Sequence, residues 1–229
     1  PMNGFRLASY GTDAGAQSAT RAPIDHPVRD FARETPVSDA VFQVYKRLYA
    51  YDRAPLDVES QLIDSTETWV REYVTFRAAY GNERVGLHLY TPRGKRGPFQ
   101  TVVYFPGSNA LWQSSFDQYS TDHAEMIVRS GRAFAFPVYK STFDRRDGFV
   151  YRRQDLTNTY RDHVLHWAKD LGRSLDYLES RADIDAGKFA YLGYSWGGMI
   201  APIMLSTEPR LKVAVLGLLH DAGQFRQRG

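Results

Sequence analysis

Hydrophobic and polar positions alternate between residues 84 and 91 of this 229-residue chain. The apolar members of the pattern are Val85, Leu87 and Leu89. Alternation with a period of two indicates a strand with one buried face. A second strand-like segment, 69–77, precedes it, and the turn-forming stretch AYGNE joins the two. The pattern therefore predicts an antiparallel pair of strands at one edge of a sheet.

After residue 100 the pattern changes to short runs that are apolar at successive positions. These runs lie at 101–105, 133–136, 189–193 and 213–219. Longer segments with helical periodicity separate them, and the clearest is 157–181, whose apolar stripe consists of Tyr160, Val164, Trp167, Leu171, Leu175 and Leu178. Strands buried on both faces that alternate with helices are typical of a parallel sheet. The sequence therefore predicts an α/β fold, with helices on both faces of a mainly parallel, twisted sheet.

The N-terminal part of the chain has a different pattern. Residues 1–36 are rich in Gly, Ala, Ser, Thr, Asp and Pro, which is typical of a linker or surface arm. Residues 37–64 are predicted to form a helical extension, because apolar side chains recur at helical spacing from Val41 to Tyr49 and Ser38 suits an N-cap. We expect a single α/β domain over residues 65–229.

Composition and charge narrow the classes of function. The chain is 43% hydrophobic and 24% charged, which is enough for one sizeable globular domain. Its formal net charge of +3 predicts no strong attraction for nucleic acid. The lack of cysteine excludes disulfides, thiol chemistry and thiolate metal sites. Because the sequence shows no metal-ligand spacing and no phosphate-binding loop, we expect neither a metal nor a cofactor.

The sequence shows no targeting signal. No apolar run is long enough to cross a membrane, and the N-terminal stretch PMNGFRLASYGTDAG lacks the basic start and apolar core of a signal peptide. These features slightly favour a cytoplasmic protein. Because the first residue is Pro1 rather than Met, we interpret the chain as a processed or engineered product, or as a piece of a longer protein.

One motif indicates nucleophilic catalysis. The predicted strand 189–193 runs into Gly193-Tyr194-Ser195-Trp196-Gly197, and an apolar segment of helical character follows. In this context a Gly-x-Ser-x-Gly sequence predicts a tight turn that holds the Ser195 hydroxyl above the sheet edge, with the N–H of Trp196 facing the oxyanion of a tetrahedral intermediate. The alternative interpretation is a glycine-rich turn that contains an incidental serine.

A second oxyanion donor is expected in the loop after the first parallel strand. The stretch VVYFPGSNA occupies residues 102–110. Gly107 would let the backbone pass close to a substrate, and the N–H of Ser108, or less favourably that of Asn109, would complete an oxyanion hole. An ordinary strand-to-helix loop is the alternative interpretation.

These motifs resemble the α/β-hydrolase superfamily over residues 65–219. The resemblance rests on two segments, HLYTPRGKRGPFQTVVYFPGS and IDAGKFAYLGYSWGG. Both are most similar to the dienelactone-hydrolase and prolyl-oligopeptidase-like branch of the superfamily. More narrowly, PIDHPVRDF and VSDAVFQVYKRLYAYDRAPLD resemble the segment that precedes hydrolase domains in bacterial kinase-type multidomain proteins. NGFRLASY resembles the last strand of a formylglycine-generating-enzyme-like domain. These resemblances imply that the chain is a slice of a larger protein.

In this superfamily the catalytic acid and then the histidine follow the nucleophile in the sequence. The residues after Ser195 contain a single histidine and a single aspartate, His220 and Asp221. Adjacent residues rarely reach the geometry in which the acid orients the far ring nitrogen, so His220 is a weak candidate for the base. His163 and His166 fall on the predicted long helix, where a solvated or satisfied role is expected. The remaining histidines, His26 and His123, have no supporting context.

The predicted hydrolase domain over 65–229 therefore lacks the usual last strands of this fold, and its catalytic machinery is incomplete. Either the chain stops early, or a complementary C-terminal segment or separate chain supplies the acid and histidine, or the protein is no longer catalytic. The leading hypothesis is a serine hydrolase that cleaves a small-molecule carboxylic ester through an acyl-enzyme on Ser195. A prolyl-oligopeptidase-type peptidase and a non-catalytic binding or regulatory module are the alternatives.

Two further segments bear on the site. Residues 141–156 mix aromatic and arginine side chains and could form an acyl pocket or attract an anionic substrate, with a solvated loop as the default interpretation. Pro202 falls inside the helix expected after Ser195, where it should kink or shorten that helix.

Overall fold

The computed structural model describes residues 30–150 and 156–217. The chain divides into two compact units, 1–39 and 40–229, and the architecture below belongs to the second. In the first unit the described residues include a short 3₁₀ helix, η1 (Phe31–Arg33). Because residues 1–29 lie outside the described residues, the arm expected over 1–36 stays a prediction. Within the described ranges, no helix is both long enough and apolar enough to cross a membrane.

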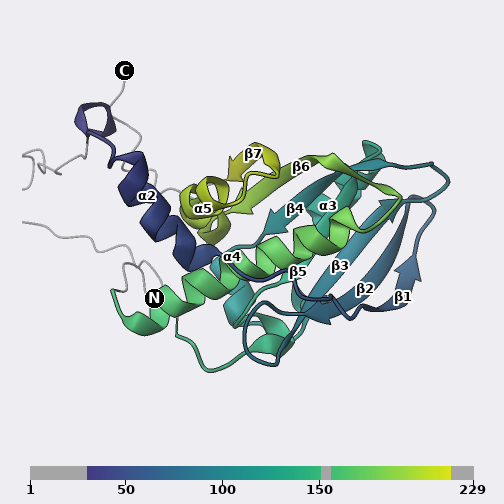
Figure 1. The fold of residues 1–229 in the computed structure, drawn as a ribbon. Coiled ribbons are helices and arrows are strands. Elements are labelled where there is room, and N and C mark those ends of the chain that lie inside the picture. The colour runs from purple at the N-terminus through teal and green to yellow at the C-terminus, as the bar shows by residue number, and fades with distance from the viewer. Residues whose placement is uncertain (1–29, 151–155, 218–229) are drawn as a thin grey trace, which may run out of the picture. The chain divides into compact units, whose positions relative to one another are not determined.

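The described residues form one seven-stranded sheet in the order β1-β2-β3-β5-β4-β6-β7 (Figure 1). The strands are β1 (Glu59–Ser65), β2 (Trp69–Arg77), β3 (Arg84–Pro92), β4 (Phe99–Phe105), β5 (Ala133–Val138), β6 (Ile184–Tyr194) and β7 (Leu211–Gly217). β4 is parallel to β5 and to β6, and β6 is parallel to β7. β1, β2 and β3 pair antiparallel, and β3 is antiparallel to β5. The structure confirms the parallel arrangement of the four apolar runs and the antiparallel hairpin.

Both margins of the sheet differ from the sequence-based prediction. β1 lies outside β2, so the hairpin is not the edge of the sheet. All side chains of β1 are exposed, and this strand therefore has no alternation that could reveal it in the sequence. At the other margin β7 pairs, among the described residues, only with β6. The apolar side chains of Val213 and Val215 are consequently exposed at 60% and 59%, although their pattern predicted a strand buried on both faces.

Helices cover both faces of the sheet. α4 (Asn158–Glu179) and α5 (Trp196–Thr207) share a core with Val103 and Phe105 of β4. α3 (Asp122–Arg129) shares a second core with Tyr104. Because successive side chains of a strand point to opposite faces, these cores lie on opposite sides of the sheet, as the ribbon shows (Figure 1).

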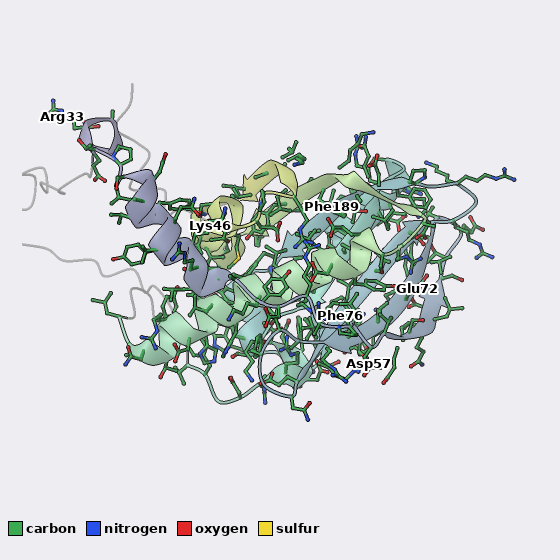
Figure 2. The ribbon with its side chains drawn as sticks, viewed as in Figure 1. Arg33, Lys46, Asp57, Glu72, Phe76 and Phe189 are labelled. Carbon is green, nitrogen blue, oxygen red and sulfur yellow. The ribbon has the colours of Figure 1, made fainter. Side chains whose placement is uncertain are left out.

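The predicted apolar stripe of the long helix is what buries α4. Trp167, Leu171, Leu175 and Leu178 are all at most 1% exposed. Phe76 of β2 lies beneath this helix, where its ring stacks on Tyr177 at a centroid distance of 5.5 Å (Figure 2). Burial of this stripe fixes the helix against the sheet and thereby places the residues at its two ends.

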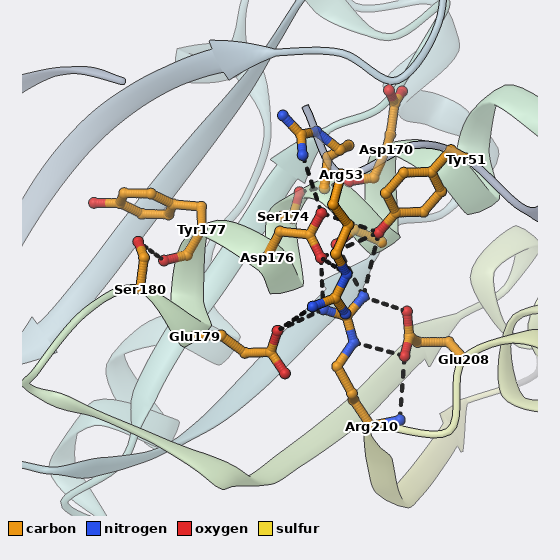
Figure 3. Close-up of polar contacts among 12 residues, drawn as sticks. Tyr51, Arg53, Asp170, Ser174, Asp176, Tyr177, Glu179, Ser180, Glu208 and Arg210 are labelled. Carbon is orange, nitrogen blue, oxygen red and sulfur yellow. Dashed lines mark hydrogen bonds and ion pairs between the residues drawn. The ribbon is translucent and has the colours of Figure 1, made fainter. Parts of the chain in front are cut away.

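The predicted helical extension over 37–64 is helical only in α2 (Asp39–Lys46) and the 3₁₀ helix η2 (Arg47–Tyr49). Its last part was predicted wrongly, because residues 59–64 belong to β1 and pair with β2. The chain after η2 is bound to α4 by polar groups, which Figure 3 shows in close-up. The hydroxyl of Tyr51 lies 3.2 Å from both carboxylate oxygens of Asp176. Arg210, from the turn between α5 and β7, donates to Asp176 at 2.7 Å and to Glu179 at 2.9 Å. Two segments remote in sequence therefore meet at the carboxylates of α4.

Candidate active site

The turn between β6 and α5 holds Ser195 in a strained conformation. Its φ of 51° and ψ of −103° lie in a region that residues with a Cβ rarely occupy. The N–H of Ser195 donates to the carbonyl of Gly217 at 2.6 Å, and the carbonyl of Ser195 accepts from the N–H of Met199 at 3.0 Å. The serine is partly exposed at the end of the strand. This is the strand-turn-helix context that the motif requires.

The glycines of the motif allow close packing beneath the serine. A Cβ on Gly193 would lie 2.6 Å from the carbonyl oxygen of Gly197. A Cβ on Gly197 would overlap the carbonyl oxygen of Phe105 at the end of β4. Neither backbone could approach the other if a side chain stood at these positions. The glycines thus bring the start of α5 against the strand that leads to the expected oxyanion loop.

The loop after β4 runs beside Ser195. A Cβ on Gly107 would lie 3.7 Å from the Cβ of Ser195. The carbonyl of Pro106 accepts the N–H of Gly197 at 3.0 Å, which joins this loop directly to the first turn of α5. Ser108 begins the 3₁₀ helix η3 (Ser108–Leu111), and within the described residues its N–H has no hydrogen-bond acceptor. The structure therefore brings Ser108, Ser195 and Trp196 into one region.

A pair of buried tyrosines lies behind this loop. The hydroxyl of Tyr119 accepts the N–H of Gly107 at 3.2 Å and is 3.2 Å from the hydroxyl of Tyr104. Burial raises the pKa of both phenols, and the charge of Tyr119 raises the pKa of Tyr104 further, whereas the hydrogen bonds from Tyr104 and from the Gly107 N–H offset part of the rise at Tyr119. Both hydroxyls therefore stay protonated at ordinary pH.

The structure gives His123 a context that the sequence did not. This half-buried residue of α3 places its ring 5.4 Å from the ring of Tyr104 and 6.0 Å from that of Tyr194, which precedes the serine. Nothing in the local sequence marked it, because it approaches the turn only through the packing of α3 on the sheet. His26, His220 and Asp221 lie outside the described residues, so their proposed or rejected roles stay predictions.

The histidines of α4 have structural partners. His163 places Nδ1 2.7 Å from the carbonyl of Thr159 and Nε2 3.0 Å from a carboxylate oxygen of Asp147. His166 stacks on Tyr80 with a centroid distance of 4.0 Å. His163 therefore has the satisfied role expected for it, whereas the ring of His166 serves in packing and its buried Nδ1 has no hydrogen-bond partner within the described residues.

The segment 141–150 is only partly the solvated loop expected by default, because Asp144, Arg146 and Val150 are exposed but its first three residues are buried. Ser141, Thr142 and Phe143 are at most 3% exposed. Arg145 donates to Asp170 at 2.7 Å and to the hydroxyl of Tyr80 at 2.7 Å. Because this buried pairing neutralises Arg145, its charge is not available to an anionic substrate. Residues 151–155 lie outside the described residues.

Two other observations complete the surroundings. We expected Pro202 to kink or shorten α5, but the helix continues past it to Thr207 and is not shortened.

A cavity of about 410 Å³ lies at the far end of α5 from Ser195, between the segment 43–53 and the turn 207–210. Since Ser195 does not line it, this cavity is separate from the candidate site. Within the described residues, no group of three or more His, Cys, Asp or Glu side chains could hold a metal ion.

Comparisons with known proteins show limited likeness in sequence and a clear likeness in fold. No family model matches the chain. YtaP of Bacillus subtilis (strain 168), whose assignment as a hydrolase is itself provisional, is 22% identical over 175 residues that cover 72% of this chain and 58% of YtaP. Acetyl xylan esterase 1 from Thermoanaerobacterium sp. JW/SL YS485 superposes with a TM-score of 0.60 at 13% identity, covering 82% of this chain and 62% of the esterase.

A second solved esterase gives the same result. Acetyl xylan esterase from Paenibacillus sp. R4 superposes with a TM-score of 0.56 at 20% identity, over 83% of this chain and 63% of that enzyme. The chain thus spans less than two thirds of the length of each of these relatives. At such identities the likeness concerns the fold, and here it agrees with the strand order and the turn at Ser195. The described part of the chain has the α/β-hydrolase fold.

Proposed function

We propose that this protein is a serine hydrolase that cleaves carboxylic esters through an acyl-enzyme on Ser195. The strained conformation of Ser195 between β6 and α5 is the observation that supports it most. Strain of this kind is retained where the surrounding structure enforces it, and it is common at functional sites. The solved esterases of the same fold support the choice of an ester over other substrates.

The proposed reaction uses the residues that the turn brings together. The Oγ of Ser195 attacks the ester carbonyl carbon while a base takes its proton. The carbonyl oxygen becomes an oxyanion, which the N–H groups of Ser108 and Trp196 would bind. The positive end of the α5 dipole would stabilise the same charge. Collapse of this intermediate releases the alcohol with a proton from the base, and water then hydrolyses the acyl-enzyme by the reverse sequence of proton transfers.

The base and its orienting acid are the open part of this proposal. His220 is the sequence-based candidate, and a complementary C-terminal segment or separate chain is the alternative source. His123 is a further candidate, because its ring lies within 6.0 Å of the ring that precedes the nucleophile. Without a base, the serine hydroxyl at its normal pKa is a poor nucleophile.

The finer placements belong to the same proposal. The resemblance to the dienelactone-hydrolase and prolyl-oligopeptidase-like branch, and the kinase-type multidomain context, remain predictions. The names of the two solved esterases favour acetyl as the acyl group. We therefore take a small acyl ester as the first substrate to test.

The test is labelling of the serine with a fluorophosphonate, together with hydrolysis of p-nitrophenyl acetate. We expect the 229-residue chain to label slowly and a form extended beyond Gly229, if the gene continues, to label fast. Loss of the base costs on the order of a thousand-fold or more in rate, so the two forms should separate clearly. Ser195→Ala should abolish labelling in both forms, and mass spectrometry of the adduct locates the modified residue.

Single-residue controls identify the base. Fast labelling of the 229-residue chain that disappears in His220→Ala would assign the base to His220. Disappearance in His123→Gln, with His220→Ala unaffected, would assign it to His123. Labelling that survives Ser195→Ala at the same rate would overturn the proposed function.

A further inference from the structure

We infer that Tyr119 is a positioning residue for ester hydrolysis: its hydroxyl fixes the peptide group before Gly107 and so holds the oxyanion loop against Ser195. This inference rests on the proposed function. Tyr119 belongs to neither sequence motif, and it follows the 3₁₀ helix η4 (Phe116–Gln118) in the connection between β4 and α3.

The peptide group that joins Pro106 to Gly107 is hydrogen-bonded at both of its polar atoms. Its carbonyl accepts the N–H of Gly197 at 3.0 Å, and its N–H donates to the Tyr119 hydroxyl at 3.2 Å. A peptide group is planar, so binding both of its polar atoms fixes the orientation of the whole unit. One partner belongs to the helix that begins at the nucleophile, and the other is Tyr119.

The next peptide group joins Gly107 to Ser108 and contains the proposed oxyanion donor, the N–H of Ser108. The carbonyl of Gly107 accepts the N–H of Ala110 at 3.1 Å within η3. In a trans peptide the N–H of Ser108 points away from that carbonyl. Gly107 is the single hinge between the two fixed groups, and glycine restricts its own dihedral angles less than any other residue. The hydroxyl of Tyr119 therefore supplies a restraint that the sequence of the loop does not.

Tyr119 is itself held in place by the side chains around it. It is 8% exposed, and its ring packs edge-on against Phe136 and Phe143 at centroid distances of 5.4 Å and 5.8 Å. Its hydroxyl lies 3.2 Å from that of Tyr104, which is 1% exposed. A buried ring with a second hydroxyl behind it gives the loop a rigid support.

The consequence belongs to the transition state rather than to substrate binding. The oxyanion forms only as the serine attacks. A displaced Ser108 N–H therefore stabilises the transition state less and leaves the free energy of the bound substrate largely unchanged. Loss of the Tyr119 hydroxyl should accordingly lower kcat with little change in KM. Tyr119 does not need to touch the substrate for this effect.

The test compares Tyr119→Phe with a matched control, Tyr139→Phe. The hydroxyl of Tyr139 is also buried and also bonds to a backbone group, the carbonyl of Tyr104 at 3.3 Å, but it does not contact the loop through that bond. Kinetics use p-nitrophenyl acetate and whichever form of the protein gives Ser195-dependent turnover. Exchange of the Gly107 amide, followed by NMR or by mass spectrometry of its peptide, reports on the loop without requiring activity.

We expect Tyr119→Phe to lower kcat about 10-fold with KM within about 2-fold, less than the roughly 100- to 1,000-fold cost of removing a direct oxyanion donor. Exchange of the Gly107 amide should accelerate about 10-fold, because its acceptor is lost. Tyr139→Phe should change neither quantity by more than about 2-fold, since it keeps the acceptor and the ring.

Each other outcome counts against the inference. Unchanged exchange in Tyr119→Phe would show that the hydroxyl does not hold the loop. Faster exchange with unchanged kcat, or an equal fall in kcat for both variants, would show that the restraint has no specific catalytic role. Absence of Ser195-dependent turnover in the wild-type protein would overturn the proposed function and the catalytic role together, and the exchange result would still decide whether Tyr119 fixes the loop.

Discussion

At the scale of single residues, the conformation of Ser195 depends on the small residues around it. A strained residue costs of the order of 1–3 kcal/mol and persists only where the surroundings enforce it. Here the enforcement comes from the hydrogen bond to Gly217 and from the contact between Gly197 and the end of β4. The conformation of Ser195 therefore depends on the packing of α5 on the sheet, and a change in that packing should alter the conformation of Ser195.

Gly197→Ala tests this dependence. The added Cβ would overlap the Phe105 carbonyl, so we expect the free energy of unfolding to fall by about 2–4 kcal/mol, with loss of fluorophosphonate labelling. Gly187→Ala is the control, because its Cβ would meet only a side-chain oxygen of Asp185 at 3.4 Å. That control should stay within about 0.5 kcal/mol of the wild type in urea denaturation. Equal stability of the two variants would contradict the packing argument.

At the scale of elements, α4 organises the chain. Its apolar stripe covers the sheet. Polar side chains in its C-terminal half bind the segment after η2 and the turn after α5 (Figure 3). Tyr51 reaches the helix at Gly172, where a Cβ would lie 2.6 Å from the Tyr51 hydroxyl. The pKa of Tyr51 is raised to about 12 by burial and by the charge of Asp176, so this hydroxyl remains a donor at ordinary pH.

Gly172→Ala gives a prediction whose sign opposes helix propensity. Alanine in place of a helical glycine ordinarily stabilises by roughly 0.5–1 kcal/mol. Here we expect the free energy of unfolding to fall by about 1–3 kcal/mol, because the Cβ displaces Tyr51 from Asp176. Limited proteolysis should also become faster between residues 47 and 57.

A double variant separates steric conflict from other effects of Gly172→Ala. In a Tyr51→Ala background the clash is absent, so the same substitution should be neutral or stabilising there. Destabilisation of equal size in both backgrounds would show that Tyr51 is not the cause.

At the scale of the whole molecule, buried ionisable groups make folding depend on pH. His88 of β3 is 8% exposed and stacks on Phe116 at 3.5 Å, and within the described residues its Nδ1 has no hydrogen-bond partner. Burial, and then the nearby charge of Arg71, lower the pKa of His88 to about 3. In the unfolded chain a histidine titrates near a pKa of about 6.5. The unfolded state therefore binds a proton that the folded state rejects.

The sign of the resulting pH dependence follows directly. The contribution of neutral His88 to stability is complete above about pH 6.5 and is lost as the pH falls toward the folded-state pKa. We expect the free energy of unfolding to fall by up to about 1.4 kcal/mol per pH unit from this one group between about pH 6 and pH 4. Urea denaturation across that range measures the slope.

His88→Phe isolates this group. The variant keeps an aromatic ring between its neighbours but cannot bind a proton. The slope of unfolding free energy against pH should therefore decrease by up to the contribution of one proton, about 1.4 kcal/mol per pH unit. Comparing slopes rather than absolute stabilities removes any packing difference between the two side chains. An unchanged slope would show that His88 does not titrate differently in the two states.

The sequence by itself determined the class of fold and the position of the candidate nucleophile. Periodicity depends on which faces of an element are buried, so the sequence alone revealed the apolar runs and the stripe of α4. The turn at Ser195 was equally readable, because a strand, a serine between glycines and a helix are adjacent along the chain. The side chains of β1 are all exposed, so no periodic signal could reveal that strand.

Only the tertiary structure decided which residues surround Ser195. The loop at Gly107 lies beside Ser195 because β4 pairs with β6, and the hydroxyl of Tyr119 reaches that loop through the packing on the face that carries α3. The neutralisation of Arg145 by Asp170 likewise depends on α4 lying against the loop after β5. Such contacts join residues that are far apart in the sequence, and local patterns contain no information about them. The order of strands and the choice of packed faces decide them instead.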